Sequence, residues 1–127
     1  MLTLTVFMPP TPKQRPVVTR EHGVYTPAKT VRAERLIAEA WRAKYSVPLR
    51  FADHIPLRLT VICYFKKPVR ARRKYPTVRP DWDNLGKMVS DALNGLAYHD
   101  DKQIVSATVE KQYGDPERIE ITLEVVE

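Results

Sequence analysis

The sequence predicts an α+β fold: a single domain, residues 1–127, with two main helices packed on a mixed β-sheet. Three observations favour this architecture. The chain has 127 residues, the usual size of one domain. Hydrophobic residues make up 43% of it, which is enough for one core. Segments with strand-like alternation are interrupted by two segments with helical spacing, an order typical of helices packed on a sheet.

The N-terminal part predicts a strand, a stiff loop and a small hairpin. Apolar residues at alternate positions predict a strand over residues 2–7. Four prolines exclude helix and central strand over 9–16, so an extended basic loop is expected there. Residues 17–19 and 24–26 are expected to form a small hairpin around Gly23.

The first helix is expected to begin with Thr26 as its N-cap and Pro27 as its first helical residue. Pro48 is expected to end it. Between them, apolar residues recur at steps of three and four, which predicts an amphipathic helix. They are Ala33, Leu36, Ile37, Ala40 and Trp41.

The second half of the chain begins with its clearest strand, residues 57–66, where apolar and polar side chains alternate. A polar loop over 66–79 follows. The second helix is expected from about Asp83 to Asn94, with Gly95 as its stop.

Two further strands are expected at 104–113 and 119–125. The segment 114–117, which contains a glycine and a proline, lies between them as a turn. Their closeness in sequence predicts that the two strands pair as a hairpin.

Charge favours a polyanionic partner. The formal net charge is +6, which is typical of proteins that bind nucleic acid. The one cysteine, Cys63, excludes an intramolecular disulfide and is expected to be a packed core thiol. No apolar run is long enough for a membrane span, and the N-terminus lacks the features of a signal peptide, so a cytoplasmic location is expected.

Five carboxylates and one lysine form the most informative pattern. Asp81 and Asp83 lie two residues apart at the start of the second predicted helix, and Asp83, Lys87 and Asp91 follow at helical steps of four. A short loop then leads to another acidic pair. The candidate metal ligands are Asp81, Asp83, Asp91, Asp100 and Asp101. Carboxylate ligands without a thiol or histidine cluster favour Mg²⁺ or Mn²⁺, and Lys87 suits a phosphate contact.

Each of these residues also has a simpler interpretation. Asp83 alone is explained as an N-cap, Asp83 with Lys87 as a surface ion pair, and Asp91 as a solvated helix residue. The pair at 100–101 alone is explained as a polar turn. Gly86, inside the helix, is either a tolerated glycine or a point of close approach by another backbone.

Basic residues directly precede the acidic segment. They are Lys66, Lys67, Arg70, Arg72, Arg73, Lys74 and Arg79, and Lys13 and Arg15 form a second basic element between prolines. A cationic loop beside carboxylates would draw a phosphate backbone toward them. The alternatives are a solvated basic loop or a localisation tract.

The motifs together resemble the RusA-type Holliday-junction resolvases, the crossover junction endodeoxyribonucleases. Three stretches carry the resemblance: the Asp-Trp-Asp-Asn-Leu-Gly-Lys run at 81–87, Asp-Ala-Leu at 91–93, and Asp-Asp-Lys-Gln-Ile at 100–104. Pro-Lys-Gln-Arg-Pro at 12–16 and Tyr-Thr-Pro at 25–27 resemble the family more weakly. The long basic loop over 70–79 departs from better-known members.

The resemblance implies a homodimeric, Mg²⁺-dependent enzyme, encoded by a bacterium or a phage, that nicks two opposing strands of a four-way DNA junction. It implies Asp81, Asp83 and Asp101 as metal ligands, with Asp100 and Asp91 in support, and Lys87 as the catalytic lysine. Two alternatives are a non-catalytic basic DNA-binding module and a less selective metal-dependent nuclease.

Overall fold

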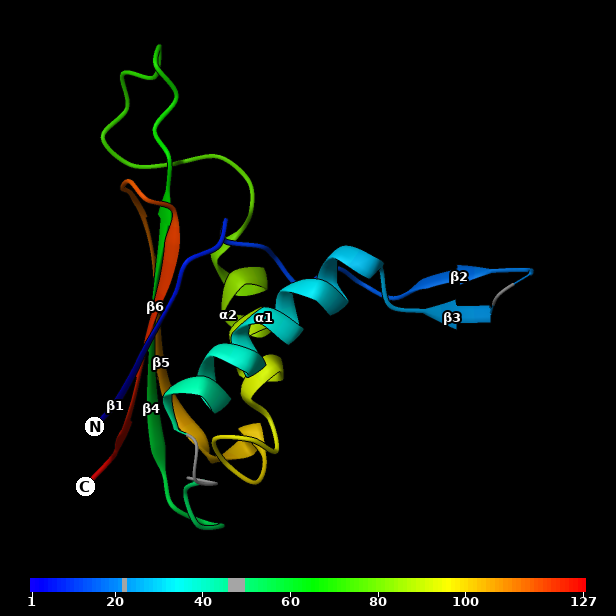
Figure 1. Cartoon of the computed structure of the whole chain (residues 1–127), viewed down its shortest axis with the longest axis vertical. Helices are drawn as coiled ribbons and strands as arrows, with labels where there is room; N and C mark the ends of the chain where they lie inside the picture. Colours follow the sequence, from blue (N-terminus) through cyan, green and yellow to red (C-terminus); the bar gives the residue numbers. More distant parts are fainter. Residues whose placement is uncertain (22, 46–49) are drawn as a thin grey trace.

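The fold is built on a four-stranded mixed β-sheet. The computed structural model describes residues 1–21, 23–45 and 50–127. The sheet has the order β1 (Leu2–Val6), β6 (Arg118–Val125), β4 (Leu57–Phe65) and β5 (Ile104–Tyr113). β6 pairs antiparallel with both neighbours, whereas β4 and β5 are parallel. The predicted α+β class with a mixed sheet is therefore confirmed (Figure 1).

The predicted hairpin between the last two strands is wrong, because β4 lies between β5 and β6. The inner face of β4 is buried, so β4 lies in the middle of the sheet. The chain then crosses over through the second helix, so β5 lies parallel to β4 and beside it. The segment 114–117 passes over the end of β4. There the Gly114 N–H donates to the Phe65 carbonyl (2.9 Å), and the Lys66 N–H donates to the Glu117 carboxylate (3.3 Å).

Both helices pack against the same face of the sheet (Figure 1). α1 spans Ala28–Lys44 and α2 spans Trp82–Leu93. The predicted cap of α1 is wrong by one residue: Pro27 stands at the N-cap position, no side chain caps the helix, and the Pro27 carbonyl accepts from the N–H groups of Thr30 and Val31. The start of α2 and the stop at Gly95, whose φ is +77°, agree with the prediction. Pro48 lies outside the described residues.

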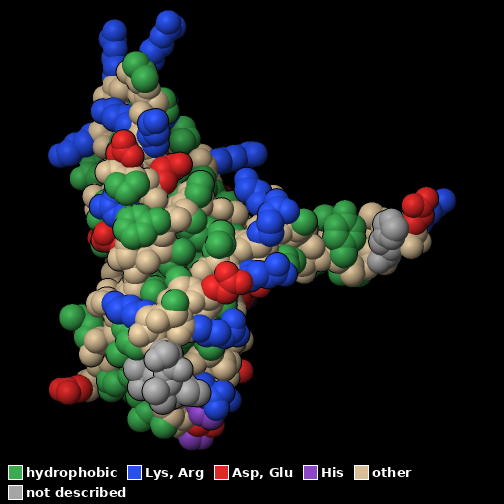
Figure 2. Space-filling model, viewed as in Figure 1, with side chains coloured by type: hydrophobic (Ala, Val, Ile, Leu, Met, Phe, Trp, Pro, Cys, Tyr) green, Lys and Arg blue, Asp and Glu red, His purple; other side chains and the backbone are tan. Residues whose placement is uncertain are grey.

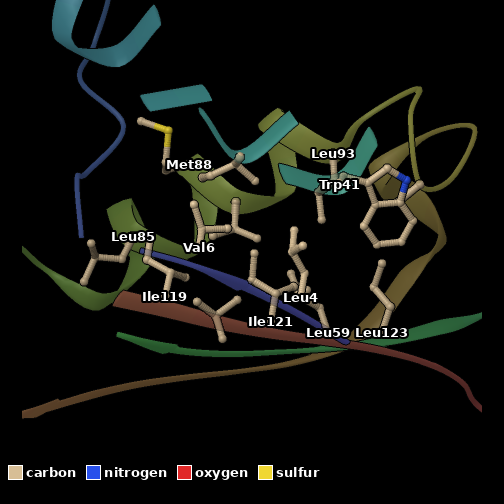
Figure 3. Packing of buried hydrophobic residues seen from close by; sticks show 14 of the residues in the cluster. Leu4, Val6, Trp41, Leu59, Leu85, Met88, Leu93, Ile119, Ile121 and Leu123 are labelled. Carbon is tan, nitrogen blue, oxygen red and sulfur yellow. The ribbon is translucent and has the colours of Figure 1, made fainter. Parts of the chain in front are cut away.

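The core fills the space between the helices and the sheet (Figure 3). Its largest fully buried side chains come from β4, β6 and both helices, and include Trp41, Ile37, Leu57, Leu85, Met88, Leu93, Ile121 and Leu123. Cys63 lies in this core, as predicted, and burial raises the pKa of its thiol to about 12. No helix within the described residues is long and apolar enough to cross a membrane.

A two-stranded hairpin projects away from the body of the molecule (Figure 1). It consists of β2 (Val17–Thr19) and β3 (Gly23–Tyr25), with Gly23 at a positive φ of 64°, in agreement with the predicted hairpin. The proline-rich segment 9–16 leads into it and has no regular secondary structure, as expected.

Candidate nucleic-acid and metal site

The first turn of α2 carries two exposed carboxylates. Asp81 stands at the N-cap position but makes no side-chain capping hydrogen bond. The Asp83 carboxylate accepts a hydrogen bond from the backbone N–H of its neighbour Asn84 (3.0 Å). N-capping, the simpler interpretation of Asp83, therefore does not account for it.

A groove of about 910 Å³ runs from these two carboxylates to the proline-rich N-terminal segment. Four cationic residues also line it: Lys13, Arg15, Lys29 and Arg79. Carboxylates and cations thus share one open groove, and a phosphate backbone lying in it would find positive charge beside the acidic pair.

Lys13 joins three elements at the edge of this groove. Its backbone N–H donates to the Asn84 carbonyl (2.9 Å), its ammonium contacts the Glu34 carboxylate of α1, and the same ammonium lies 3.3 Å from Asp91 of α2. Burial opposes the charge of Lys13, but hydrogen bonds and attraction from Glu34 and Asp91 outweigh burial and raise its pKa. The ammonium is thus held by two carboxylates in a partly buried position, and its predicted DNA contact stays a prediction.

The later turns of α2 carry the predicted catalytic lysine. The Lys87 ammonium lies 3.1 Å from the Asp91 carboxylate, four residues further along the helix. The Lys87 side chain is 58% exposed, whereas that of Asp91 is only 20% exposed. Asp91 is therefore a half-buried carboxylate between two lysines, and Lys87 has its ammonium available to solvent.

The acidic pair at 100–101 lies in a turn that Gln103 holds in place. Asp100 precedes the short 3₁₀ helix Asp101–Gln103, and its carboxylate accepts the Lys102 N–H (2.9 Å). The buried Gln103 side chain accepts from the backbone N–H groups of His99 (2.9 Å) and Asp100 (3.2 Å). It also donates to the carbonyls of residues 52 (2.9 Å) and 55 (3.2 Å). The turn is thereby fixed to the segment before β4.

The two carboxyl groups of this turn have opposite pKa shifts. The hydrogen bond from the Lys102 N–H lowers the pKa of Asp100. Burial raises the pKa of Asp101, and the hydrogen bond to Asp100, the charge of Asp100 and the charge of Asp91 add to it, with Lys87 opposing. Asp101 therefore lies within electrostatic reach of Asp91 and Lys87, in a place with excess negative charge.

The structure thus places the five acidic residues in two groups. Asp81 and Asp83 lie at the start of α2, whereas Asp91 lies near Asp100 and Asp101. Eight residues of helix between Asp83 and Asp91 correspond to about 12 Å. Among residues 1–21, 23–45 and 50–127, no three His, Cys, Asp or Glu side chains lie close enough to hold a metal ion. The predicted ligand set stays a prediction.

The basic loop 66–79 projects beyond the end of β4 (Figure 1), and Figure 2 shows Lys and Arg side chains gathered at that end of the molecule. The seven predicted cations in it are all exposed: Lys66, Lys67, Arg70, Arg72, Arg73, Lys74 and Arg79. Two of them stand over aromatic rings, Lys67 over Tyr113 and Lys74 over Tyr75, each at 5.7 Å.

Arg79 links the loop to the acidic groove. Besides lining the groove, it lines a hollow of about 450 Å³ under the loop and a recess of about 580 Å³ beside Asp81 and Asp83. The arrangement brings the basic loop, the groove and the acidic pair into one continuous region.

Sequence reasoning missed two contributors to this site. Gln103 belongs to a motif that gives it no role, although an Asp followed three residues later by Gln is a capping pattern that indicates a fixed turn. Glu34, the partner of Lys13, carries no sequence signal, because 21 residues separate the two and only the tertiary fold joins them.

Comparison with known proteins finds one family match over most of the chain and partial matches to two relatives. Residues 8–124 match the family described as Endodeoxyribonuclease RusA. A stretch of 51 residues, 40% of this chain, is 47% identical to 36% of the uncharacterized protein YqaN of Bacillus subtilis (strain 168). A stretch of 75 residues, 58% of this chain, is 36% identical to 57% of the crossover junction endodeoxyribonuclease rusA of Lactococcus phage r1t. Each match thus covers less than two thirds of the relative's length.

Proposed function

The chain belongs to the RusA endodeoxyribonuclease family, and from this membership we propose that it is a homodimeric, Mg²⁺-dependent resolvase that makes paired nicks in four-way DNA junctions. The observation that carries the proposal is the match over residues 8–124, which includes every acidic residue of the motifs, the lysine of α2 and both basic elements.

The surface chemistry supports DNA as the substrate. Cations of the basic loop and of the groove lie on both sides of Asp81 and Asp83, and Arg79 belongs to both sets. Lys and Arg contacts to phosphates supply a large share of the affinity of DNA binding. The backbone of one DNA strand is therefore proposed to follow the groove past the start of α2.

The donor set fits a hard divalent cation. All five predicted ligands are carboxylates, and Mg²⁺ prefers such oxygens. The raised pKa of Asp101 comes from burial and from the negative charge of its neighbours, and a bound cation would relieve that repulsion. Family membership implies Asp81, Asp83 and Asp101 as the ligands, supported by Asp100 and Asp91. Because Asp101 lies in the second acidic group, holding one ion would require the two groups to approach each other when the metal binds. When bound, such an ion activates water and stabilises the leaving oxygen of a phosphodiester.

The remaining roles fall to residues of this chain. Lys87 has a largely exposed side chain beside Asp91, where its ammonium would bind a phosphate oxygen and stabilise developing charge. Gln103 is a positioning residue, because it fixes the turn that carries Asp100 and Asp101. The cations of the basic loop would orient the DNA.

Two nicks in opposing strands require two sets of catalytic residues, and the chain carries one motif set. A two-fold dimer would place two identical sites on a junction that itself has approximate two-fold symmetry. This reasoning supports the homodimer as part of the proposal.

The deciding experiment is cleavage of a labelled four-way junction, with duplex, flap and single-stranded DNA as controls, in Mg²⁺ and in EDTA. Paired nicks in the junction alone, lost in EDTA and in Asp83→Asn, are expected. Asp53→Asn is the matched control, because Asp53 is also exposed and also accepts the N–H of the following residue (3.1 Å). Junction binding without cleavage would favour a binding module, and equal cleavage of every substrate a less selective nuclease.

A further inference from the structure

Trp82 is an exposed aromatic residue that the core does not explain. Of the two tryptophans, Trp41 is 2% exposed and packs in the core, whereas Trp82 is 64% exposed. Trp82 lies three and seven residues before the buried Leu85 and Val89, on the same stripe of α2, but its ring remains in solvent. Single exposed apolar side chains are common on protein surfaces, so the surroundings of Trp82, and not its exposure alone, indicate its role.

The neighbours of Trp82 are charged. Trp82 lines the recess of about 580 Å³ together with Arg79, Lys111 and the carboxylates of Asp81 and Asp83. The Lys111 ammonium also donates to the Val78 carbonyl, which fixes it at the edge of this recess. An aromatic side chain that shares a recess with two cations and two carboxylates offers stacking for a base and charge for its phosphate.

We propose that Trp82 is a stacking platform for an unstacked nucleobase at the centre of a DNA junction. Bases inside a duplex are already stacked on both faces, so they are not available to the ring. Bases at a branch point expose a face at little cost, and the ring would then bind branched DNA more tightly than duplex. Trp82 would therefore supply structure selectivity, a role separate from phosphate binding by the loop.

The position of Trp82 connects this selectivity to cleavage. It stands between Asp81 and Asp83 in sequence and shares a recess with both. A base stacked on its ring has its own sugar–phosphate linkage within a few ångströms, so stacking would bring a phosphodiester of the branch point beside the carboxylates.

A second copy of this chain is the rival occupant of the same surface. The centres of protein interfaces are depleted of charged residues, whereas four of the residues around Trp82 carry charge: Arg79, Asp81, Asp83 and Lys111. This chemistry favours a nucleotide over a protein partner.

The test measures DNA binding in EDTA for Trp82→Ala, Trp82→Phe and Phe7→Ala. Phe7 is the matched control, because it is 71% exposed directly after β1 and does not line the recess. Trp82→Ala is expected to weaken junction affinity about 5- to 150-fold with little change for duplex, as expected for one lost base stack. Trp82→Phe should recover most of the affinity, and Phe7→Ala should bind like the unmodified protein.

Tryptophan fluorescence gives a second, direct readout. Junction DNA should quench the Trp82 emission, duplex should not, and the Trp82→Phe variant should report only the unquenched Trp41. Unchanged junction affinity in Trp82→Ala together with unquenched emission would overturn the inference. So would a shift from dimer to monomer in Trp82→Ala without DNA, because the ring would then be covered by a second copy.

The inference rests on the proposed function, and the two can fail separately. If the unmodified protein neither prefers nor cuts four-way junctions, the proposed function fails. Single-stranded oligonucleotides, whose bases are free to stack, then still test the platform: quenching of Trp82 supports it, and its absence overturns it.

Discussion

The Lys13 ammonium lies 3.3 Å from the Asp91 carboxylate and also contacts Glu34, so a residue of the proline-rich segment ties both helices together. Neither partner is near Lys13 in sequence. Lys13 lines the same groove as Asp81 and Asp83, so the ion pair makes it a structural residue of the site.

We therefore expect Lys13→Met to lower the free energy of unfolding by about 1–2 kcal/mol, because two partly buried carboxylates lose their cation. The folded pKa of Lys13 is raised above 10.5, so this stabilisation is present below pH 10.5 and is lost as the pH rises through the folded value. Urea denaturation at several pH values measures it. The control is Lys29→Met, because Lys29 is an exposed lysine of the same groove. Equal stability of the two variants would contradict the structural role of Lys13.

Gln103 offers a prediction on the acidic turn. Gln103→Leu removes a buried side chain that makes four hydrogen bonds, so we expect a loss of roughly 2–4 kcal/mol in unfolding free energy and a large loss of junction cleavage. The control is Gln112→Leu. This substitution removes one exposed hydrogen bond on β5 and should change the free energy of unfolding by less than about 0.5 kcal/mol. Full cleavage by Gln103→Leu would show that the acidic turn does not need the Gln103 hydrogen bonds for activity.

The basic loop makes a prediction about salt. If Arg72 and Arg73 each contact a phosphate, their joint change to Gln should weaken DNA binding and reduce the slope of log affinity against log salt by about 1.8. Binding titrations at several salt concentrations measure the slope. The double change of Arg42 and Arg50, exposed residues outside the loop, should leave the slope unchanged. An unchanged slope in the Arg72 and Arg73 variant would show that these two residues do not contact the DNA phosphates.

Local patterns predicted the elements well, because alternation and helical spacing report burial directly. The predicted hairpin was wrong because distant strands compete to pair with β6. β4, which has a buried inner face, pairs with β6 in place of β5, although β5 and β6 are neighbours in sequence. No local signal between residues 104 and 125 reports that competition.

The site shows the same division. The order of the acidic residues along the chain is sufficient to indicate the family, but the distances among them depend on the path of the chain. The split between Asp83 and Asp91 follows from helix geometry alone, whereas the contacts of Lys13 with Glu34 and Asp91 depend on how three segments pack.

Gly86 gives a final prediction that separates helix propensity from packing. An added Cβ at Gly86 would lie 2.9 Å from the Cγ2 of Val109, so the glycine lets α2 approach β5 closely. Alanine in a helix interior is normally about 1 kcal/mol more favourable than glycine, and here the clash should reverse that sign. Gly86→Ala is expected to destabilise the protein in thermal or urea unfolding. Val109→Ala removes the clashing methyl groups, so Gly86→Ala should become stabilising when it is added to the Val109→Ala variant. Equal effects of Gly86→Ala in both backgrounds would show that the contact with Val109 does not decide the residue at 86.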